Sequence, residues 1–501
     1  MGAGARRSAR TMLFLVLVFV AVAVARTALG DVSDGGGGTG GEDREQFLRL
    51  WMDGGGEADD QDGHLEWEEE ENDDDDEDHI MMWGRGTGRP PTGRNVVNVD
   101  TFGAVGDGNA DDTQAFSDAW KTACALDNAV FLVPGGRRYK VGASKFTGPC
   151  KRKMNIQIQG TIVAPEEPSE WDSRSPQLWL LFSGLAGARI EGGGVIDGSG
   201  SKWWARSCKI NKDNPCKPAP TAVTIDSCRG VRVRRLRVQN AQQMHFTVSR
   251  SRNVRVAGLH VEAPEDSPNT DGIHIAESTA VTIQSCRIGT GDDCISISNA
   301  SFNIRMKNID CGPGHGISIG SLGKDNTFAA VENVALDTAR IRRAQNGVRI
   351  KTWQGGAGYV RNVRFSNVLV DDVDHPIIID QFYCDSRNPC HNQTSNVQVS
   401  NVVYRNISGT SRRAEAIKFA CSDAVPCSDI VLSDINLRRG GGGGDEVQTV
   451  CNCAMGFDYG RVRPAADCLR SSTCGGAPDY HTDGDDDDDQ GKADTILHTE
   501  L

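Results

Sequence analysis

Three short segments in the middle of the chain each carry a titratable side chain two residues before an Ile-x-Ile stretch. These side chains belong to Asp271, Asp293 and His315, and the step from one to the next is 22 residues both times. If each repeat is one coil of a solenoid, neighbouring coils stack at about 4.8 Å, the spacing of paired strands. The sequence therefore predicts that the three side chains gather in one patch.

A further carboxyl group, that of Asp292, immediately precedes Asp293. Cleavage of a glycosidic bond requires one protonated carboxyl group at the leaving oxygen and one ionised carboxylate that activates water. Three crowded carboxylates cannot all ionise freely, so the pKa of at least one should rise. A single aspartate in such a setting is more often a turn former. The alignment of three aspartates with His315 instead favours acid–base catalysis.

The elements that must position these residues are short Val- and Ile-rich stretches broken by Asn, Gly and Asp. Repeats of this size, built from strands and turns, predict an all-β fold, a right-handed parallel β-helix. A β-sandwich is the alternative, but the two-residue Asn-Gly or Asp-Gly hairpin signature does not recur regularly. A helical pattern around residues 112–126 predicts a short helix that caps the N-terminal coil. The aligned repeat starts are Val231, Val254, Val281, Ile304, Val334, Val363 and Val397.

The composition divides the 501-residue chain into four regions. Residues 1–30 have the arginines and the short apolar run of a secretory signal peptide, and a signal anchor is the alternative. Residues 31–94 are Gly-rich and then acidic, and together with the acidic tail 479–501 they are expected to be disordered. Residues 95–478 remain as the folded domain. No segment after the signal peptide is apolar enough to span a membrane.

The formal net charge of −14 arises from the two acidic regions. Residues 31–94 carry 21 acidic and 5 basic residues, whereas residues 95–478 carry 38 acidic and 44 basic residues. A mildly cationic folded domain suits a polyanionic partner through electrostatic steering. Nucleic acid is not expected, because the chain has no dense basic stripe. One hypothesis is that residues 31–94 occupy the binding site as a polyanion until they are removed; a solvating segment is the alternative.

Sixteen cysteines, all after the signal peptide, indicate an oxidising compartment and disulfide bonds. Metal binding is the alternative, but Cys451-Asn452-Cys453 lacks zinc-ligand spacing and no paired CxxC occurs. Three Asn-x-Ser/Thr triplets, beginning at Asn299, Asn392 and Asn406, are potential glycosylation acceptors. The close pairs that predict small local loops are Cys208/Cys216, Cys384/Cys390, Cys421/Cys427 and Cys468/Cys474.

Four motifs resemble the signatures of polygalacturonases, the pectin-hydrolysing enzymes of glycoside hydrolase family 28, plant type. The motifs are Asn269-Thr270-Asp271, Gly291-Asp292-Asp293, Gly314-His315-Gly316 and Arg349-Ile350-Lys351, and they occur in the family's order. The similarity covers roughly residues 95–475. It implies hydrolysis of α-1,4-galacturonan, a polyanionic polysaccharide of the cell wall. The enzyme is expected to be a secreted monomer that needs no metal or other cofactor.

The resemblance also implies roles for individual residues. Asp292 is expected to be the proton donor, while Asp271 and Asp293 hold and activate the water of an inverting reaction. Inverting enzymes place their carboxyl groups about 6.5–9.5 Å apart. His315 is expected to assist by tuning the donor carboxyl. The residues expected to bind substrate are Asn269, Arg349, Lys351 and Tyr383.

Two of these substrate-binding residues also follow from the strand pattern. Arg349 and Lys351 alternate with apolar residues, so both side chains point away from the interior on one face. Two cations beside the carboxylates would bind a uronate carboxylate, with the arginine offering a bidentate fork; a solvated face is the alternative. Other possible functions are a calcium-dependent pectate lyase, a rhamnogalacturonan hydrolase and a non-catalytic wall-binding protein. The sequence does not separate endo from exo action.

Overall fold

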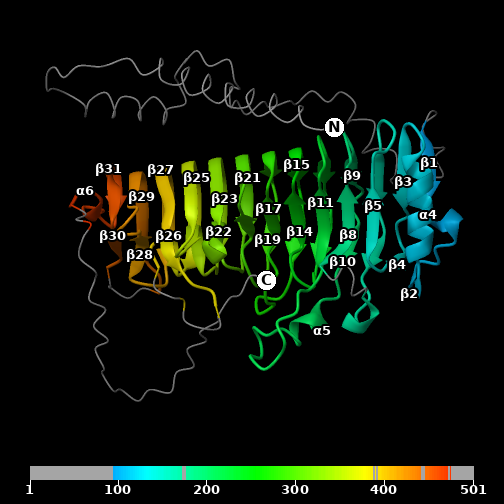
Figure 1. Ribbon diagram of the computed structural model, residues 1–501, viewed down its shortest axis with the longest axis horizontal. Helices are drawn as coiled ribbons and strands as arrows, with labels where there is room; N and C mark the ends of the chain where they lie inside the picture. The colour runs from blue at the N-terminus through cyan, green and yellow to red at the C-terminus, as the bar shows by residue number, and fades with distance from the viewer. Residues whose placement is uncertain are drawn as a thin grey trace, which may run out of the picture. The chain divides into compact units, whose positions relative to one another are not determined.

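The computed structural model describes residues 94–171, 177–386, 390, 393–441, 446–471 and 474. The predicted signal peptide and the two acidic regions expected to be disordered lie outside the described residues, apart from Arg94. The described part is a stack of parallel β-coils, which confirms the predicted β-helix (Figure 1). Within it, no helix has the length and apolar character needed to cross a membrane.

The strands form two sheets, and the smaller one, named sheet B, has eleven strands. Each strand of sheet B pairs in parallel with the strand of the next coil. From the N-terminal end the strands are β5 (Ser144–Thr147), β8 (Leu178–Ser183), β11 (Thr221–Asp226), β14 (Phe246–Ser249), β17 (Ile273–Ala276), β20 (Ile295–Ile297), β22 (Ile317–Leu322), β24 (Asn346–Trp353), β26 (His375–Tyr383), β28 (Glu415–Ala420) and β30 (Gln448–Asn452).

Sheet A contains the other twenty strands. Early coils contribute two short strands each, and from β21 onward the two merge into one long strand, since both β18 and β19 pair with β21. The strands are β1 (Asn95–Asn98), β2 (Asp107–Asp111), β3 (Ala129–Val133), β4 (Arg138–Lys140), β6 (Asn155–Ile158), β7 (Thr161–Val163), β9 (Arg189–Glu191), β10 (Val195–Asp197), β12 (Arg232–Arg234), β13 (Arg237–Gln239), β15 (Arg252–Ala257), β16 (His260–Glu262), β18 (Thr279–Gln284), β19 (Arg287–Gly289), β21 (Ser301–Cys311), β23 (Phe328–Arg342), β25 (Ala357–Val373), β27 (Asn396–Ser411), β29 (Cys427–Arg439) and β31 (Ala454–Arg463).

The register of sheet B agrees with the 22-residue step in the sequence. Ile273 of β17 is paired with Ile295 of β20, which is paired in turn with Ile317 of β22. All three side chains are buried in the interior of the stack. Because side chains alternate across a strand, this inward row leaves the residues between them, such as Ser296, on the outer face.

Asparagines with positive φ mark a bend that is repeated in the long strands of sheet A. Asn303, Asn333, Asn362 and Asn401 have φ values between 53° and 59°. Their side chains stack from coil to coil, with Asn333 donating to Asn303 at 3.0 Å and Asn362 donating to Asn333 at 3.1 Å. Asparagine tolerates this left-handed conformation better than most residues. The ladder therefore holds successive coils in one register.

The predicted capping helix is present as α4 (Thr113–Cys124) at the N-terminal end of the stack (Figure 1). Its apolar face buries Phe116 and Trp120. The two rings make edge-on contacts with Phe131 of β3 and Phe146 of β5. The helix therefore covers the first coils and closes an apolar end that would otherwise pair with other chains. The remaining helices are short: η1 (Val99–Phe102), η2 (Pro168–Glu170), α5 (Ser201–Trp204), η3 (Lys324–Asn326) and α6 (Cys468–Ser471).

Six disulfide bonds lie within the described residues, and three of them were predicted as small loops. Cys208–Cys216, Cys384–Cys390 and Cys421–Cys427 are bonded as expected. The expected pair of Cys468 with Cys474 is wrong, because the helix α6 places Cys468 against Cys451 of the last strand of sheet B, to which it is bonded. The other two bonds are Cys124–Cys150 and Cys294–Cys311.

Candidate active site

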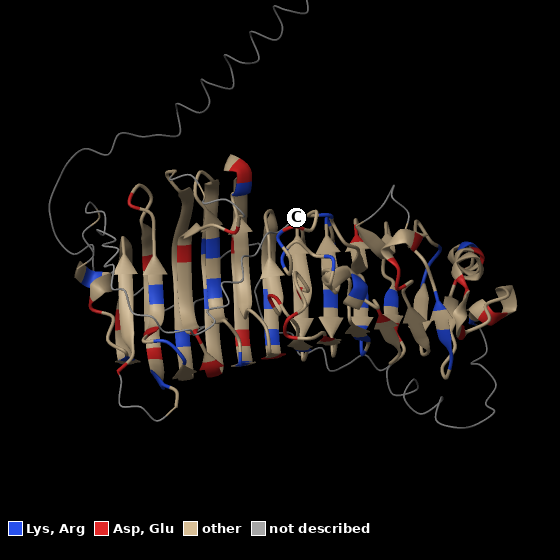
Figure 2. Ribbon diagram, turned by 90° about the horizontal axis from the view of Figure 1, so that it is seen from below, with Lys and Arg blue, Asp and Glu red and all other residues tan. Residues whose placement is uncertain are grey.

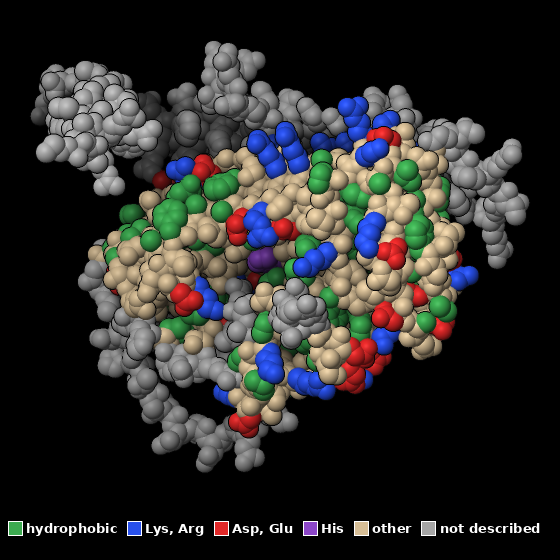
Figure 3. Space-filling model, turned by 45° about the vertical axis from the view of Figure 1, so that its right-hand side comes forward, with side chains coloured by type: hydrophobic (Ala, Val, Ile, Leu, Met, Phe, Trp, Pro, Cys, Tyr) green, Lys and Arg blue, Asp and Glu red, His purple; other side chains and the backbone are tan. Residues whose placement is uncertain are grey.

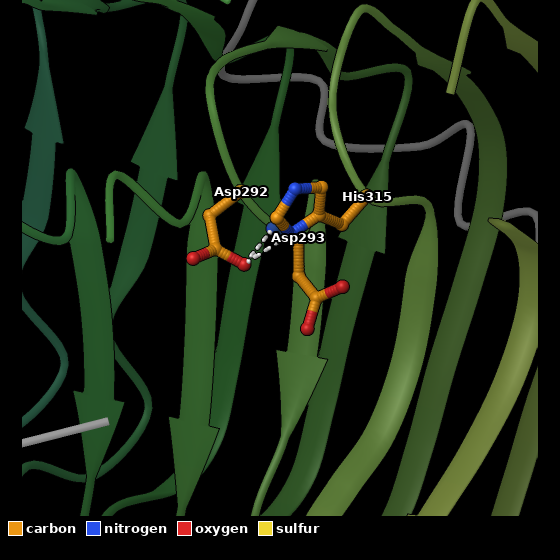
Figure 4. A group of neighbouring side chains, drawn as sticks. All are labelled: Asp292, Asp293 and His315. Carbon is orange, nitrogen blue, oxygen red and sulfur yellow. Dashed lines mark hydrogen bonds and ion pairs between the residues drawn. The ribbon is translucent and has the colours of Figure 1, made fainter. Parts of the chain in front are cut away.

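The predicted acid–base residues lie where three neighbouring strands of sheet B begin. Asp271, Asp293 and His315 each stand two residues before the first residue of β17, β20 and β22. A carboxylate oxygen of Asp292, one of Asp293 and a ring nitrogen of His315 all lie within 4.8 Å of one another (Figure 4). Asp293 is fully buried, and Asp271 and Asp292 are 4% and 6% exposed. The chain therefore brings these residues into one largely buried patch.

Glycines on both sides of His315 allow the coils to approach each other at this point. Gly314 and Gly316 have φ values of +151° and +100°. A Cβ atom on Gly314 would lie 2.6 Å from the carbonyl oxygen of Asp292, and one on Gly316 would lie 2.1 Å from that of Asn346. Both distances are too short for real atoms, so only glycine fits here. The two glycines fix the backbone that carries the imidazole.

Asp292 and His315 form a hydrogen-bonded pair on adjacent coils. His315 Nδ1 lies 2.9 Å from Asp292 Oδ1 (Figure 4). The same oxygen accepts a hydrogen bond from the backbone N–H of Asp293 at 2.8 Å, and Asn269 Nδ2 lies 3.5 Å from Asp292 Oδ2. The predicted residue Asn269 thus reaches the carboxylate of Asp292.

Asp293 lies between two cations that come from a later coil. Arg349 Nη2 donates to Asp293 Oδ1 at 2.8 Å, and Lys351 Nζ donates to Asp293 Oδ2 at 3.1 Å. Ser318 Oγ also donates to Oδ1 at 2.7 Å. Both cationic side chains point outward on β24, as the sequence predicts, but they are almost fully buried, at 9% and 2% exposure. Part of their charge is therefore already balanced by Asp293.

These neighbours determine the pKa values of the two adjacent carboxyl groups. Burial favours the neutral form of Asp292, but His315, Lys351 and the backbone N–H of Asp293 together outweigh burial and hold its pKa well below the usual range. Burial acts in the same way on Asp293, and there Arg349 and Lys351 lower the pKa. The rise in pKa expected for at least one of the three carboxyl groups is therefore not found at Asp292 or Asp293, because positive charges lie beside both.

Asp271 completes the patch from the preceding coil. Its Oδ2 atom accepts a hydrogen bond from Ser296 Oγ at 2.7 Å. Its carbonyl oxygen accepts from the backbone N–H of His245 at 2.8 Å and lies 3.1 Å from His245 Nδ1. Figure 3 shows a hollow in the surface with a histidine side chain at its floor and acidic and basic side chains around it. A patch of this kind can transfer protons and bind an anion.

The comparisons with known proteins agree with this chemistry. Residues 124–456 match the model of glycosyl hydrolases family 28. The chain belongs to this family of glycoside hydrolases. A probable polygalacturonase of Arabidopsis thaliana is 47% identical over 384 residues, which cover 76% of this chain and 86% of the relative. A polygalacturonase of Persea americana is 46% identical over 366 residues, covering 73% and 78%.

A solved structure extends the comparison to the fold. The endo-xylogalacturonan hydrolase of Aspergillus tubingensis is 25% identical, with a TM-score of 0.60. The alignment covers 73% of this chain and 100% of that enzyme. The resemblance to plant polygalacturonases that the four motifs predict is thus confirmed for this family 28 chain.

Tyr383, the remaining predicted residue of this family 28 enzyme, lies next to the cations. The ring centroid of Tyr383 is 5.0 Å from Lys351 Nζ, a cation–π arrangement. Trp353 packs edge-on against the same ring at 5.6 Å. The phenol oxygen donates to Asp385 Oδ2 at 3.4 Å. The position of Tyr383 therefore depends on groups from its own coil and the preceding one.

Two further residues of the site have no predicted role. His245 is fully buried and holds the backbone of Asp271, and burial lowers the pKa of its imidazole to about 4. Asp380 of β26 is paired with Lys351 in the strand register, and burial raises the pKa of its carboxyl group. The signal for His245 is a lone histidine before a strand, and a lone histidine is most often structural. Asp380 could be found only from the register of β24 and β26, which the sequence around a single residue does not give.

The cluster of Asp292, Asp293 and His315 is also a set of three possible metal ligands. However, Arg349 and Lys351 already donate to both oxygens of Asp293. Two cations at this distance oppose the binding of a divalent ion through Coulomb repulsion. Seen from below, basic and acidic residues are interspersed along the strands (Figure 2). The absence of a metal requirement stays a prediction.

Proposed function

We propose that this family 28 enzyme hydrolyses α-1,4-galacturonosyl linkages of polygalacturonan. The observation that carries the proposal is the contact of Asp293 with Arg349 and Lys351, beside the Asp292–His315 pair. Cations next to acid–base carboxylates suit a sugar whose own carboxylate lies at the cleavage point. The names of the plant relatives, which are polygalacturonases, support the same substrate.

In the proposed mechanism Asp292 protonates the leaving oxygen. Lys351 is one of the charges that lower the pKa of Asp292. When a substrate carboxylate binds beside Lys351, it neutralises this charge, and the pKa of Asp292 rises towards that of a proton donor. His315 Nδ1 lies 2.9 Å from Asp292 Oδ1, close enough to exchange a proton with this carboxyl group. Binding of the anionic sugar would thus prepare the acid.

Asp271 and Asp293 are the proposed holders of the attacking water. The distance between Asp292 and Asp293, at most 4.8 Å for one pair of oxygens, is shorter than the 6.5–9.5 Å expected for inversion. A retaining reaction would instead require one carboxylate to attack the sugar. Asp293 is poorly suited to attack, because it is fully buried and both oxygens accept hydrogen bonds. We therefore propose inversion, with Asp271 as the more accessible base.

The test is an assay on polygalacturonate in the presence of a chelator. New reducing ends without unsaturated, ultraviolet-absorbing products are expected. Unsaturated products, or activity that the chelator abolishes, would indicate a calcium-dependent lyase instead. Proton NMR during the first turnovers reports the anomer released: the β-anomer supports inversion of the α-linkage, and the α-anomer contradicts it.

We also propose that residues 1–30 are a signal peptide, that residues 31–94 and 479–501 are acidic flanks, and that residues 95–478 act as a secreted cell-wall enzyme. The six disulfide bonds support an oxidising compartment. N-terminal sequencing of the protein recovered from the culture medium tests both points. An N-terminus at Met1 in the cell fraction alone would contradict them.

A further inference from the structure

Lys209 and Asp385 form a buried ion pair between the connection that precedes β11 and the connection that follows β26. Lys209 Nζ lies 3.6 Å from Asp385 Oδ1, and the two side chains are only 4% and 2% exposed. Lys209 precedes β11, and Asp385 follows β26 by two residues. The strands β11 and β26 belong to distant coils of sheet B. The pair therefore joins two distant coils.

The segment that carries Lys209 has to extend along the stack of coils to make this contact. Five strands, β14, β17, β20, β22 and β24, separate β11 from β26. Six steps of about 4.8 Å correspond to roughly 29 Å. Among these strands are those preceded by Asp271, Asp293 and His315. Figure 1 shows α5 and the chain after it projecting beyond the strands on the same side as the loop that follows β26.

The ion pair of Lys209 and Asp385 is named the bridge. Disulfide bonds restrict the backbone next to both of its residues. Cys208, next to Lys209, is bonded to Cys216, and Cys384, next to Asp385, is bonded to Cys390. Side-chain freedom lost on forming an ion pair is smaller where the backbone is already fixed. The bridge therefore connects two loops that disulfide bonds already constrain.

The bridge leads by direct contacts to the acid–base patch. Asp385 accepts from the phenol of Tyr383, whose ring lies against Lys351, and Lys351 donates to Asp293. A buried carboxylate without a cation is costly, so Asp385 can hold Tyr383 only while Lys209 balances its charge. Loss of Lys209 would let Asp385 move towards water and release the ring.

We propose that Lys209 is a positioning residue of the substrate site, which acts through Asp385 to hold Tyr383 against Lys351. This inference rests on the proposed function, because it assigns Tyr383 to the binding of the galacturonate chain. It also implies that the Lys209 segment lies close to the site that binds the polysaccharide. Lys209 is thus expected to affect binding of substrate more than the chemical step.

The experiment compares K209M, K209R and D385N with K212M, a control that removes an exposed lysine of the same disulfide loop. K209M and D385N are expected to raise KM for polygalacturonate about tenfold, with kcat changed less than about threefold. K209R should restore KM to within about twofold, and K212M should leave it unchanged. In a Y383A background, K209M should raise KM less than about twofold further, because both changes affect one interaction.

A second readout does not depend on activity. Nitration of Tyr383, mapped by peptide mass spectrometry, should increase in K209M and D385N but not in K212M, because the freed phenol becomes accessible. Should K209M fail to fold, the K209M/D385N double variant removes both charges and should show the same rise in KM and nitration.

The outcomes separate the two proposals. Unchanged KM and unchanged nitration in folded K209M overturn the positioning role, as does a full additive effect in the Y383A background. Increased nitration without any cleavage of polygalacturonate by the wild type would support the bridge and overturn the proposed function.

Discussion

Asp293 and Lys351 are 58 positions apart in the sequence, yet Lys351 Nζ donates to Asp293 Oδ2 at 3.1 Å and both side chains are almost fully buried. The two residues lie on coils separated by β22, the strand between β20 and β24. In a stack of parallel coils, such a contact forms with little further loss of conformational entropy, because each coil is already fixed by its neighbours. Arg349, Lys351 and Asp293 therefore form one electrostatic unit.

Replacement of Asp293 by asparagine should abolish most activity. The variant keeps the shape of the side chain but loses the charge that binds Arg349 and Lys351. We expect kcat on polygalacturonate to fall by about 10³-fold, within the range of acid–base groups. Asp310→Asn is the matched control, since Asp310 accepts from Arg342 at 2.8 Å in a partly exposed position. Equal kcat for Asp293→Asn and wild type would contradict the proposed role.

Replacement of Gly316 by alanine should displace His315. A new Cβ would lie 2.1 Å from a backbone oxygen, and the φ of +100° already disfavours alanine. We expect a loss of stability of about 2–3 kcal/mol or more, together with loss of activity. Gly187→Ala is the control, because Gly187 has a φ of +62° but nothing within 4 Å of the added atom. Its cost should be about 1 kcal/mol, with activity retained. Urea unfolding and initial rates measure both effects, and similar costs at the two sites would refute the steric explanation.

His245 should make stability depend on pH. Burial lowers the pKa of its imidazole from 6.5 to about 4, so the unfolded chain binds the extra proton more readily between these values. The stability contributed by neutral His245 is present above pH 6.5 and is lost as the pH falls towards 4, by up to about 3 kcal/mol. Urea unfolding at several pH values should show a shallower dependence for His245→Gln than for wild type. Parallel curves would show that other groups cause the dependence.

Replacement of Arg349 by lysine should change the preference between charged and esterified substrate. Lysine cannot reproduce the donation from Arg349 Nε to Ser318 at 2.9 Å together with that to Asp293. We expect kcat/KM to fall about tenfold or more on polygalacturonate and less on methyl-esterified pectin. Arg361→Lys, at a more exposed ion pair with Glu332, is the control and should leave the ratio unchanged. An equal fall on both substrates would argue against recognition of the uronate by Arg349.

The sequence predicts the site well where the coils have equal length. A step of 22 residues placed Asp271, Asp293 and His315 in register, and Ile273, Ile295 and Ile317 are paired as that step requires. The apolar alternation is a short-range signal, so it survives without knowledge of the rest of the fold.

Other features depend on long-range contacts that no local pattern contains. The step from Ile317 to its partner Val348 is longer, so the contact of Arg349 and Lys351 with Asp293 could not be read from spacing. The same contact lowers the pKa of Asp293, although burial and the neighbouring carboxyl group of Asp292 would raise it. The bond of Cys468 to Cys451 follows from how α6 docks on the final coil, which a count of residues between cysteines does not reveal.

The alternation of side chains along sheet B also limits how this enzyme can diversify. Extra residues in a connection such as the one before β11 lengthen a loop outside the strands and leave the strands unchanged. One extra residue inside β20, in contrast, would turn the following side chains to the other face and put serines where the isoleucines pack. We therefore expect natural variation among relatives to accumulate as insertions in the connections, while the coils that carry the aspartates keep a constant length.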